Sequence, residues 1–208
     1  MKCRLHNFLK VVRYLAWLSI PAKTFNVGSY RRQDTPQPKA DFFDTSNPEG
    51  ERLRHAAAEA AVADMVRWFE SRQGYIAILD ATNSTKSRRK WVAERCREKN
   101  IQTLYVESKC DDESIIMSNI LDVKTTSPDY EGQNSELAAI DFRNRIRNYE
   151  RVYETIDGDE EKDLTFVKLI DVGKQVIINQ IKDYLQSRVV YYLMNLHIKP
   201  RSIWLSRV

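Results

Sequence analysis

Glycine is scarce in this sequence, with six in 208 residues. None of the six lies in a G-x-x-x-x-G-K-[ST] segment, the loop whose backbone N–H groups, lysine and hydroxyl hold nucleotide phosphates and Mg²⁺. Met1–Asn7 contains no glycine, and the cations Lys2 and Arg4 cannot replace a ring of backbone amides. The sequence as written therefore predicts no phosphate loop of this type.

Cysteine and long apolar runs are scarce as well. Cys3, Cys96 and Cys110 form an odd set without C-x-x-C spacing, which argues against a disulfide framework or a zinc site and favours free thiols in a reducing compartment. No apolar run approaches the roughly 18 residues of a membrane span. The segment Phe8–Leu18 is interrupted by charges and has no signal-peptide cleavage pattern. We expect a soluble cytoplasmic domain with no membrane partner.

The sequence also lacks a large excess of positive or negative side chains. The chain has 33 Lys and Arg against 29 Asp and Glu, a net charge of +4, and no basic stripe interleaved with aromatic residues. A domain that contacts nucleic acid is therefore a disfavoured alternative, and we expect no nucleic-acid partner. The length and the 42% hydrophobic content are those of one good-sized globular domain.

What is present is an alternation of helical and strand patterns. Apolar spacing predicts helices over residues 8–18, 48–69, 86–99, 113–123, 135–153, 176–185 and 188–193. Short apolar runs predict strands over residues 23–27, 75–79, 103–107, 165–170 and 202–205. Polar composition predicts surface loops over residues 29–43 and 157–163, and Gly74 is placed to stop the preceding helix. Strands separated by helices favour parallel βαβ units, an α/β fold.

The segment from Tyr75 to Arg89 has the clearest chemical pattern. A short apolar run ends in Asp80, and a hydroxyl-rich basic turn with Thr82 and Arg88 follows and opens a helix. Ligands of α/β folds bind outside the carboxyl ends of strands, and an aspartate there is one way to hold Mg²⁺ beside phosphates. An aspartate at a strand end is also often only a turn residue, and paired arginines are often solvated surface.

A second pattern lies in the helix predicted over residues 135–153. Arg145 and Tyr149 are four residues apart, so both can point from one helical face toward one ligand. Guanidinium groups bind phosphate dianions bidentately and keep their proton. An exposed charged helix face is the alternative interpretation of the same spacing.

Several blocks of residues, in order along the chain, carry a resemblance to a known family. The blocks are Phe25–Arg32, Asp80–Thr85 with Arg88-Arg89, Val106–Asp112, Ser118–Lys124, Ser127–Tyr130, Arg145–Glu150, Ile170–Gly173 and Gln186–Asn195. They resemble the kinase half of the bifunctional 6-phosphofructo-2-kinase/fructose-2,6-bisphosphatase family. The resemblance begins near Arg13 and covers nearly all of the chain that follows.

The resemblance implies a P-loop-kinase-like three-layer α/β domain with a mainly parallel sheet. Residues 1–200 would form the kinase domain, N-terminally incomplete because the first strand and the phosphate loop are missing. Residues 201–208 would be the start of a truncated phosphatase domain that stops before its Arg-His-Gly segment. Without the first strand we expect a gap in the centre of the sheet, and without that segment we expect no phosphatase chemistry.

The resemblance also implies a reaction, the transfer of the ATP γ-phosphoryl group to the 2-hydroxyl of fructose 6-phosphate with Mg²⁺. Asp80 matches the acidic residue at the reacting centre and beside the metal, and Cys110 matches a cysteine assigned to the active site. The fructose 6-phosphate pocket matches Arg31, Arg54, Thr82, Arg88, Lys124, Arg145 and Tyr149. The nucleotide-contacting segment matches Asn119, Ile120, Leu121, Asp122, Val123 and Lys124.

Two readings of the missing loop stay open at this point. The chain can be a 6-phosphofructo-2-kinase whose N-terminal segment is missing from this sequence, or a catalytically inactive relative that binds fructose 6-phosphate, a second copy of itself or a full-length partner. In both cases we expect little or no ATP-dependent transferase activity from these 208 residues alone.

Overall fold

A computed structural model describes residues 5–112 and 128–196 of the chain. Helices and strands alternate through both ranges, and each strand is five residues long. The elements are α1 Leu5–Trp17, β1 Ala22–Asn26, α2 Val27–Asp34, the 3₁₀ turn η1 Ala40–Phe43, α3 Pro48–Glu70, β2 Ile76–Asp80, α4 Lys86–Arg97, β3 Tyr105–Lys109, η2 Pro128–Tyr130, α6 Ser135–Glu150, β4 Phe166–Ile170, η3 Asp171–Gly173, β5 Gln175–Asn179 and α7 Tyr184–Met194.

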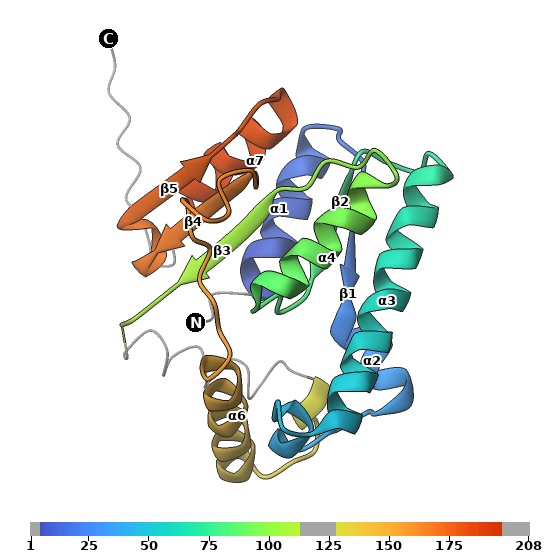
Figure 1. Cartoon of the computed structure of the whole chain (residues 1–208), viewed down its shortest axis with the longest axis vertical. Helices are drawn as coiled ribbons and strands as arrows, with labels where there is room; N and C mark the ends of the chain where they lie inside the picture. Colours follow the sequence, from blue (N-terminus) through green and yellow to red (C-terminus); the bar gives the residue numbers. More distant parts are fainter. Residues whose placement is uncertain (1–4, 113–127, 197–208) are drawn as a thin grey trace.

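The strands within these ranges form two small sheets, so the predicted α/β class is confirmed (Figure 1). β1 and β2 are parallel, with Asn26 opposite Asp80 at their carboxyl ends. β3 and β4 are parallel as well, whereas β5 runs antiparallel to β4. The described strands are mainly parallel, as we expected, but they form two sheets in place of one.

Helices cover both sheets on two faces, which gives three layers (Figure 1). One core cluster joins α1 and α7 to both sheets, with Leu15, Ile78, Val167 and Val190 among its buried members. On the other face α3 and α4 pack against β1, and α4 also reaches β3 and β4 through Ala93. These apolar clusters hold the two sheets in place without hydrogen bonds between β2 and β3.

A cavity of about 670 Å³ lies between the two sheets. Its walls include residues 76–79 of β2 and residues 105–108 of β3, together with side chains of α3, α4 and α7. Among the described strands, β2 pairs with β1 alone and β3 with β4 alone. The turn after β2 contributes Thr82 and Asn83 to the rim of this cavity.

The sequence predicted several helices through their end signals. Asn47 caps α3 by accepting a hydrogen bond from the Gly50 N–H, and Pro48 follows as the first helical residue. We expected Gly74 to end α3, but it does not. The helix stops at Glu70, and a Cβ on Gly74 would lie 2.4 Å from the Trp68 ring. This glycine is required for close packing.

Three further predictions were wrong or need adjustment. Residues 29–43 are not simply a loop, because Asn26 caps the helix α2 and η1 follows. Residues 176–185 were predicted as a helix, but Gln175–Asn179 is strand β5, where a β-branched run pairs with β4. The helix α6 ends at Glu150, before residue 153. The predictions for residues 113–123 and 202–205 lie outside the described residues.

A buried ion cluster joins α2, η2 and α6. Arg31 donates to both oxygens of Asp129 at 2.7 and 2.8 Å, and Arg145 donates to the same carboxylate at 2.9 Å. Arg145 also donates to Asp141 at 2.9 Å and to the Pro38 carbonyl. Burial alone would raise the pKa of Asp129, but the hydrogen bonds and charges of the two arginines outweigh it and lower that pKa.

In the described residues we find no helix that is both long enough and apolar enough to cross a bilayer. The two cysteines among them, Cys96 and Cys110, are buried. Burial raises the pKa of Cys96 to about 11, so this thiol stays protonated at neutral pH.

The core cluster leads to a first prediction. Leu15 is fully buried between the helices and the sheets, so Leu15→Ala leaves a cavity and should lower the free energy of unfolding by about 2–5 kcal/mol. Urea unfolding followed by circular dichroism measures this change. Leu137→Ala, at a position 66% exposed, is the control and should change little. A loss at Leu15 no larger than at Leu137 would contradict the described core.

The ion cluster leads to a second prediction. Asp129→Asn removes the charge that the buried guanidinium groups of Arg31 and Arg145 share and should cost about 3–5 kcal/mol at pH 7. Since the folded pKa of Asp129 lies below its unfolded value, the stabilisation is present above about pH 4 and is lost as the pH falls through the folded pKa. The difference between the two proteins should therefore shrink in acid.

Urea unfolding across about pH 3 to 7 checks this second prediction. Glu49→Gln, in the exposed ion pair with Arg52, is the matched control and should cost less than about 1 kcal/mol. A cost at Asp129 that stays the same across this pH range would show that its charge does not stabilise the fold.

Candidate functional site

The carboxyl ends of β1 and β2 place two polar side chains next to each other. Asn26 donates from Nδ2 to Asp80 Oδ2 at 2.6 Å. The other side-chain atom of Asn26, Oδ1, accepts from the Ser29 N–H and caps α2. Asp80 is therefore held at the end of its strand, where the sequence placed it. Asn26 was noted only as part of a matching block, and its role in orienting Asp80 was missed.

The turn that follows β2 carries Thr82 and leads into α4. Asn83 has a φ of +42°, a left-handed conformation that asparagine tolerates better than most residues. The Asn83 Oδ1 atom is buried and lacks a hydrogen-bond partner among the described residues. Thr85 then caps α4 by accepting from the Arg88 N–H at 3.2 Å. The turn thus presents polar groups at the carboxyl end of the strand.

Arg88 lies at the start of α4 and is half-buried. Its guanidinium sits 4.5 Å from the centre of the Trp91 ring. Burial lowers the pKa of Arg88, and the charge of Glu59 only partly offsets this. In the described part of the chain no carboxylate oxygen lies within 4.0 Å of Arg88, so this cation lacks an ion pair there.

Arg54 lies in the N-terminal half of α3 and, like Arg88, is half-buried. It donates to the Phe42 carbonyl, and its guanidinium is 5.7 Å from the Phe42 ring centre. Burial lowers its pKa, while Tyr149, Glu51 and Asp44 act in the opposite direction from a distance. Within the described ranges Arg54 has no ion pair with a carboxylate.

The Phe43 ring brings three of the predicted pocket residues together. The guanidinium groups of Arg31 and Arg145 lie 5.4 and 4.5 Å from its centre, and the Tyr149 ring centre is 5.9 Å away. Arg31 and Arg145 also bind Asp129, as described above. Phe43 and Asp129 are therefore parts of the site that sequence reasoning missed. Asp129 lies in the matching block Ser127–Tyr130, which could have drawn attention to it, whereas Phe43 lies in none of the matching blocks.

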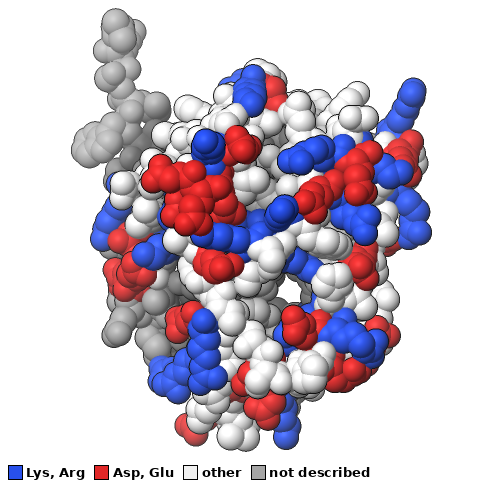
Figure 2. Space-filling model, viewed as in Figure 1, with Lys and Arg blue, Asp and Glu red and all other residues white. Residues whose placement is uncertain are grey.

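The N-terminal half of α3 lies between these two groups of residues. Arg54 faces η1 and Tyr149, whereas His55, the next residue, lies 5.3 Å from the Trp91 ring that Arg88 covers. Figure 2 shows a hollow near the middle of one face, between α4 on one side and α2 and α6 on the other as seen in Figure 1. The structure thus arranges Arg54, Arg88 and the Phe43 group around neighbouring sides of one helix.

Of the remaining predicted residues, Cys110 is described by the structure and the others lie outside the described residues. Cys110 is buried directly after β3, and its thiol donates weakly to the Asp112 carbonyl at 4.0 Å. Asp111, beside it, donates its N–H to Asp171 at the end of β4. The predicted nucleotide segment and one sugar-phosphate residue lie outside the described residues, namely Asn119, Ile120, Leu121, Asp122, Val123 and Lys124.

The described side chains contain no group of three or more His, Cys, Asp or Glu suited to a metal ion. Asp80 supplies one carboxylate at the carboxyl end of β2. Mg²⁺ at phosphate sites is commonly held by one or two carboxylates together with phosphate oxygens and waters, so a single aspartate fits such an ion.

Comparison with known proteins covers nearly the whole chain. A family model described as 6-phosphofructo-2-kinase matches residues 7–200. A Saccharomyces cerevisiae protein named fructose-2,6-bisphosphatase is 47% identical over 95% of this chain and 44% of its own length. The 6-phosphofructo-2-kinase/fructose-2,6-bisphosphatase 3 of Rattus norvegicus is 44% identical over 95% of this chain and 36% of its own length.

A bifunctional enzyme of Caenorhabditis elegans with the same family name is 42% identical over 95% of this chain and 45% of its own length. The chain therefore spans less than half the length of these curated relatives. The resemblance seen in the sequence is confirmed by matches of this extent. The chain belongs to the 6-phosphofructo-2-kinase family.

Proposed function

We propose that the chain binds fructose 6-phosphate beside the N-terminal half of α3, as the sugar-phosphate site of a 6-phosphofructo-2-kinase. The observation that carries this proposal is the partial burial of the Arg54 and Arg88 cations without a neighbouring carboxylate among the described residues. Both guanidinium groups are half-buried, both pKa values are lowered by burial, and neither has a carboxylate ion pair among the described residues.

Burial of a cation is unfavourable unless an anion or hydrogen bonds compensate for the lost water. The arginines that are more deeply buried, Arg31, Arg89 and Arg145, each bind a carboxylate at 2.7 to 2.9 Å. Arg54 and Arg88 differ from them in this respect, and a phosphate dianion would supply the missing charge. This contrast favours an anionic ligand over two solvated surface cations.

The other predicted residues complete the proposed pocket. Arg31 and Arg145 form one wall through their shared contact with Phe43, and Tyr149 adds a hydroxyl from the same helix as Arg145. Thr82 comes from the turn after β2, and Lys124 is proposed from the family resemblance alone. The sugar would then lie between this turn and η1.

Phosphoryl transfer in this family would place Asp80 at the reacting centre. Asp80, oriented by Asn26, would hold and orient the attacking 2-hydroxyl and supply a carboxylate to Mg²⁺. The metal, when bound with ATP, neutralises charge on the phosphate oxygens. We propose residues 119–124 for the nucleotide and a position near the site for Cys110, with no covalent role.

A second candidate is a relative that binds without catalysis. It rests on the sequence, which contains no G-x-x-x-x-G-K-[ST] segment. Such a chain would bind fructose 6-phosphate and act through a second copy of itself or a full-length relative. In both candidates we place the protein in the cytoplasm, assign residues 1–200 to the kinase domain and keep residues 201–208 as the proposed start of a phosphatase domain.

Arg54 and Arg88, which lack a carboxylate partner among the described residues, lead to a third prediction. Arg54→Met and Arg88→Met should each raise the Kd for fructose 6-phosphate at least about tenfold, since a hydrogen bond to a charged group contributes about 1.5–3 kcal/mol. Calorimetric titration measures this, with fructose as the ligand that lacks phosphate. Arg52→Met, which removes an exposed arginine of the same helix, is the matched control and should leave the Kd unchanged. Equal binding by all four proteins would exclude Arg54 and Arg88 from the site.

A fourth prediction separates the two candidate functions. We expect saturable binding of fructose 6-phosphate by the purified chain but little turnover when Mg·ATP is added, because the sequence contains no G-x-x-x-x-G-K-[ST] segment to hold the β- and γ-phosphates. Calorimetry with each ligand and a coupled assay for ADP provide the measurements. Turnover comparable with that of an intact relative would reject the inactive binder.

A further inference from the structure

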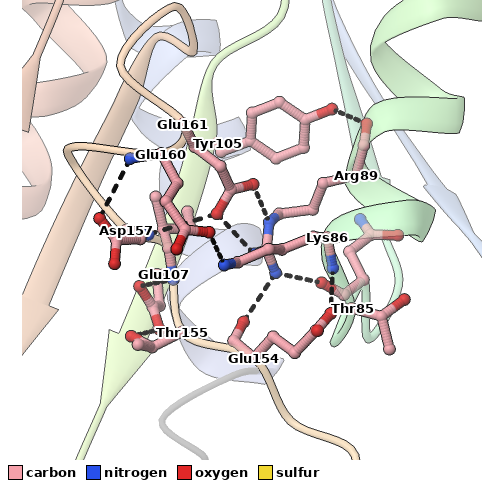
Figure 3. Close-up of polar contacts among 12 residues, drawn as sticks. Thr85, Lys86, Arg89, Tyr105, Glu107, Glu154, Thr155, Asp157, Glu160 and Glu161 are labelled. Atoms are coloured by element: carbon pink, nitrogen blue, oxygen red, sulfur yellow. Dashed lines mark hydrogen bonds and ion pairs between the residues drawn. The ribbon is translucent and has the colours of Figure 1, made fainter.

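A polar network lies beside the turn after β2, which carries Thr82 and leads to Arg88 at the start of α4, and Figure 3 shows its members. Its centre is Arg89, which is only 3% exposed. Arg89 donates to both carboxylate oxygens of Glu161, from Nε at 2.8 Å and from Nη2 at 2.7 Å. The acidic loop that we expected to be solvated is therefore partly folded inward, although Figure 2 shows many acidic side chains on its outer surface.

Arg89 also reaches the turn itself. Its Nη1 donates to the Glu154 carbonyl at 2.8 Å and to the Asn83 carbonyl at 3.4 Å. Each guanidinium nitrogen of Arg89 thus has an acceptor. Because Asn83 holds a left-handed conformation, the contact with Arg89 helps to keep the turn in a shape that the chain adopts at a cost.

Glu154 holds the same turn from the other side. Its backbone N–H donates to the Ser84 carbonyl at 2.8 Å, and its carboxylate accepts from the Lys86 N–H at 2.6 Å. The second contact satisfies a free N–H in the first turn of α4 and places a negative charge there, which is favourable. Glu154 therefore contacts Ser84 and Lys86, and Glu161 contacts Arg89, so the two glutamates together hold the segment from Asn83 to Arg89.

The loop that supplies these two glutamates is itself fixed to strand β3. Glu107 of β3 accepts hydrogen bonds from the Thr155 hydroxyl at 2.8 Å and the Ile156 N–H at 3.2 Å, and also from the Tyr153 hydroxyl. Tyr105 of β3 donates to the Arg89 carbonyl at 2.6 Å. The turn after β2 is thus connected through this loop to β3, a strand of the other sheet.

We infer that Glu161 and Glu154 are positioning residues for sugar-phosphate binding, which they serve by fixing the turn that presents Thr82 and Arg88. This inference rests on the proposed function, because it concerns the affinity of that site. Arg88 has no carboxylate of its own among the described residues, so its place is set by the Trp91 ring and by the backbone of this turn. A ligand contact that depends on one guanidinium is sensitive to small displacements of that backbone.

The inference is tested by Glu161→Gln, which keeps the size of the side chain and removes its charge. We expect the Kd for fructose 6-phosphate to rise about tenfold, as is usual for residues coupled in one hydrogen-bond network. Glu154→Ala, at an exposed position, is a milder second variant and should raise the Kd about threefold by the same coupling. Glu160→Gln, which removes a more exposed ion pair of the same loop with Lys86, is the matched control and should leave the Kd unchanged.

A double-mutant cycle distinguishes positioning from a general loss of stability. If Glu161 acts through Arg88, then Glu161→Gln should change the Kd by less than about twofold when Arg88 is already methionine. The same change should keep its full effect when Arg54 is methionine, because Arg54 lies on the opposite side of the proposed site. Equal effects in the two backgrounds would overturn the positioning role.

Hydrogen exchange gives a readout that does not need a ligand. Glu161→Gln should increase exchange of the amides from residue 84 to residue 89 while α3 stays protected. Faster exchange there with an unchanged Kd would overturn the inference and leave the proposed function intact. Failure of the unaltered chain to bind fructose 6-phosphate would overturn the proposed function, and the positioning role with it.

Discussion

The buried Asp129 carboxylate, which accepts from Arg31, Arg32 and Arg145, is the contact on which the shape of the candidate site depends. It accepts from Arg31 on α2 and from Arg145 on α6, helices that are far apart in the chain. The apolar cluster under α6 is small and contacts mainly Tyr130 of η2. The helix is therefore held against α2 and η1 largely by charge-assisted hydrogen bonds, which are shorter and stronger than neutral ones.

This constraint divides the arginines of the site into two kinds. Arg31, Arg89 and Arg145 use their donors on carboxylates and carbonyls, so they fix the walls and the turn. Arg54 and Arg88 are less buried and pack on aromatic rings, without a carboxylate partner among the described residues. A phosphate site needs both kinds of arginine. The arginines that contact the ligand keep their positions only if paired arginines and other contacts fix the surrounding backbone and side chains.

How far the sequence could predict the fold depends on the kind of signal in each segment. The apolar run before Asp80 and the caps of α3 and α4 are local features, and the structure has β2, α3 and α4 where they were expected. Residues 175–179 were harder, because a short β-branched run can belong to a helix or a strand until a partner is known. Pairing with β4 made it a strand. The division into two sheets is likewise a matter of which strand edges meet.

The sequence by itself determined the family and the set of candidate residues, because ordered blocks along a chain identify relatives without any coordinates. It also placed Asp80 at the end of a strand, since apolar periodicity and turn composition are local. Only the tertiary structure decided which arginines are paired, that Asn26 orients Asp80, and that Glu161 folds inward onto Arg89. Electrostatic and hydrogen-bond energies depend on distances between segments remote in the chain, and no local pattern of residues specifies those distances.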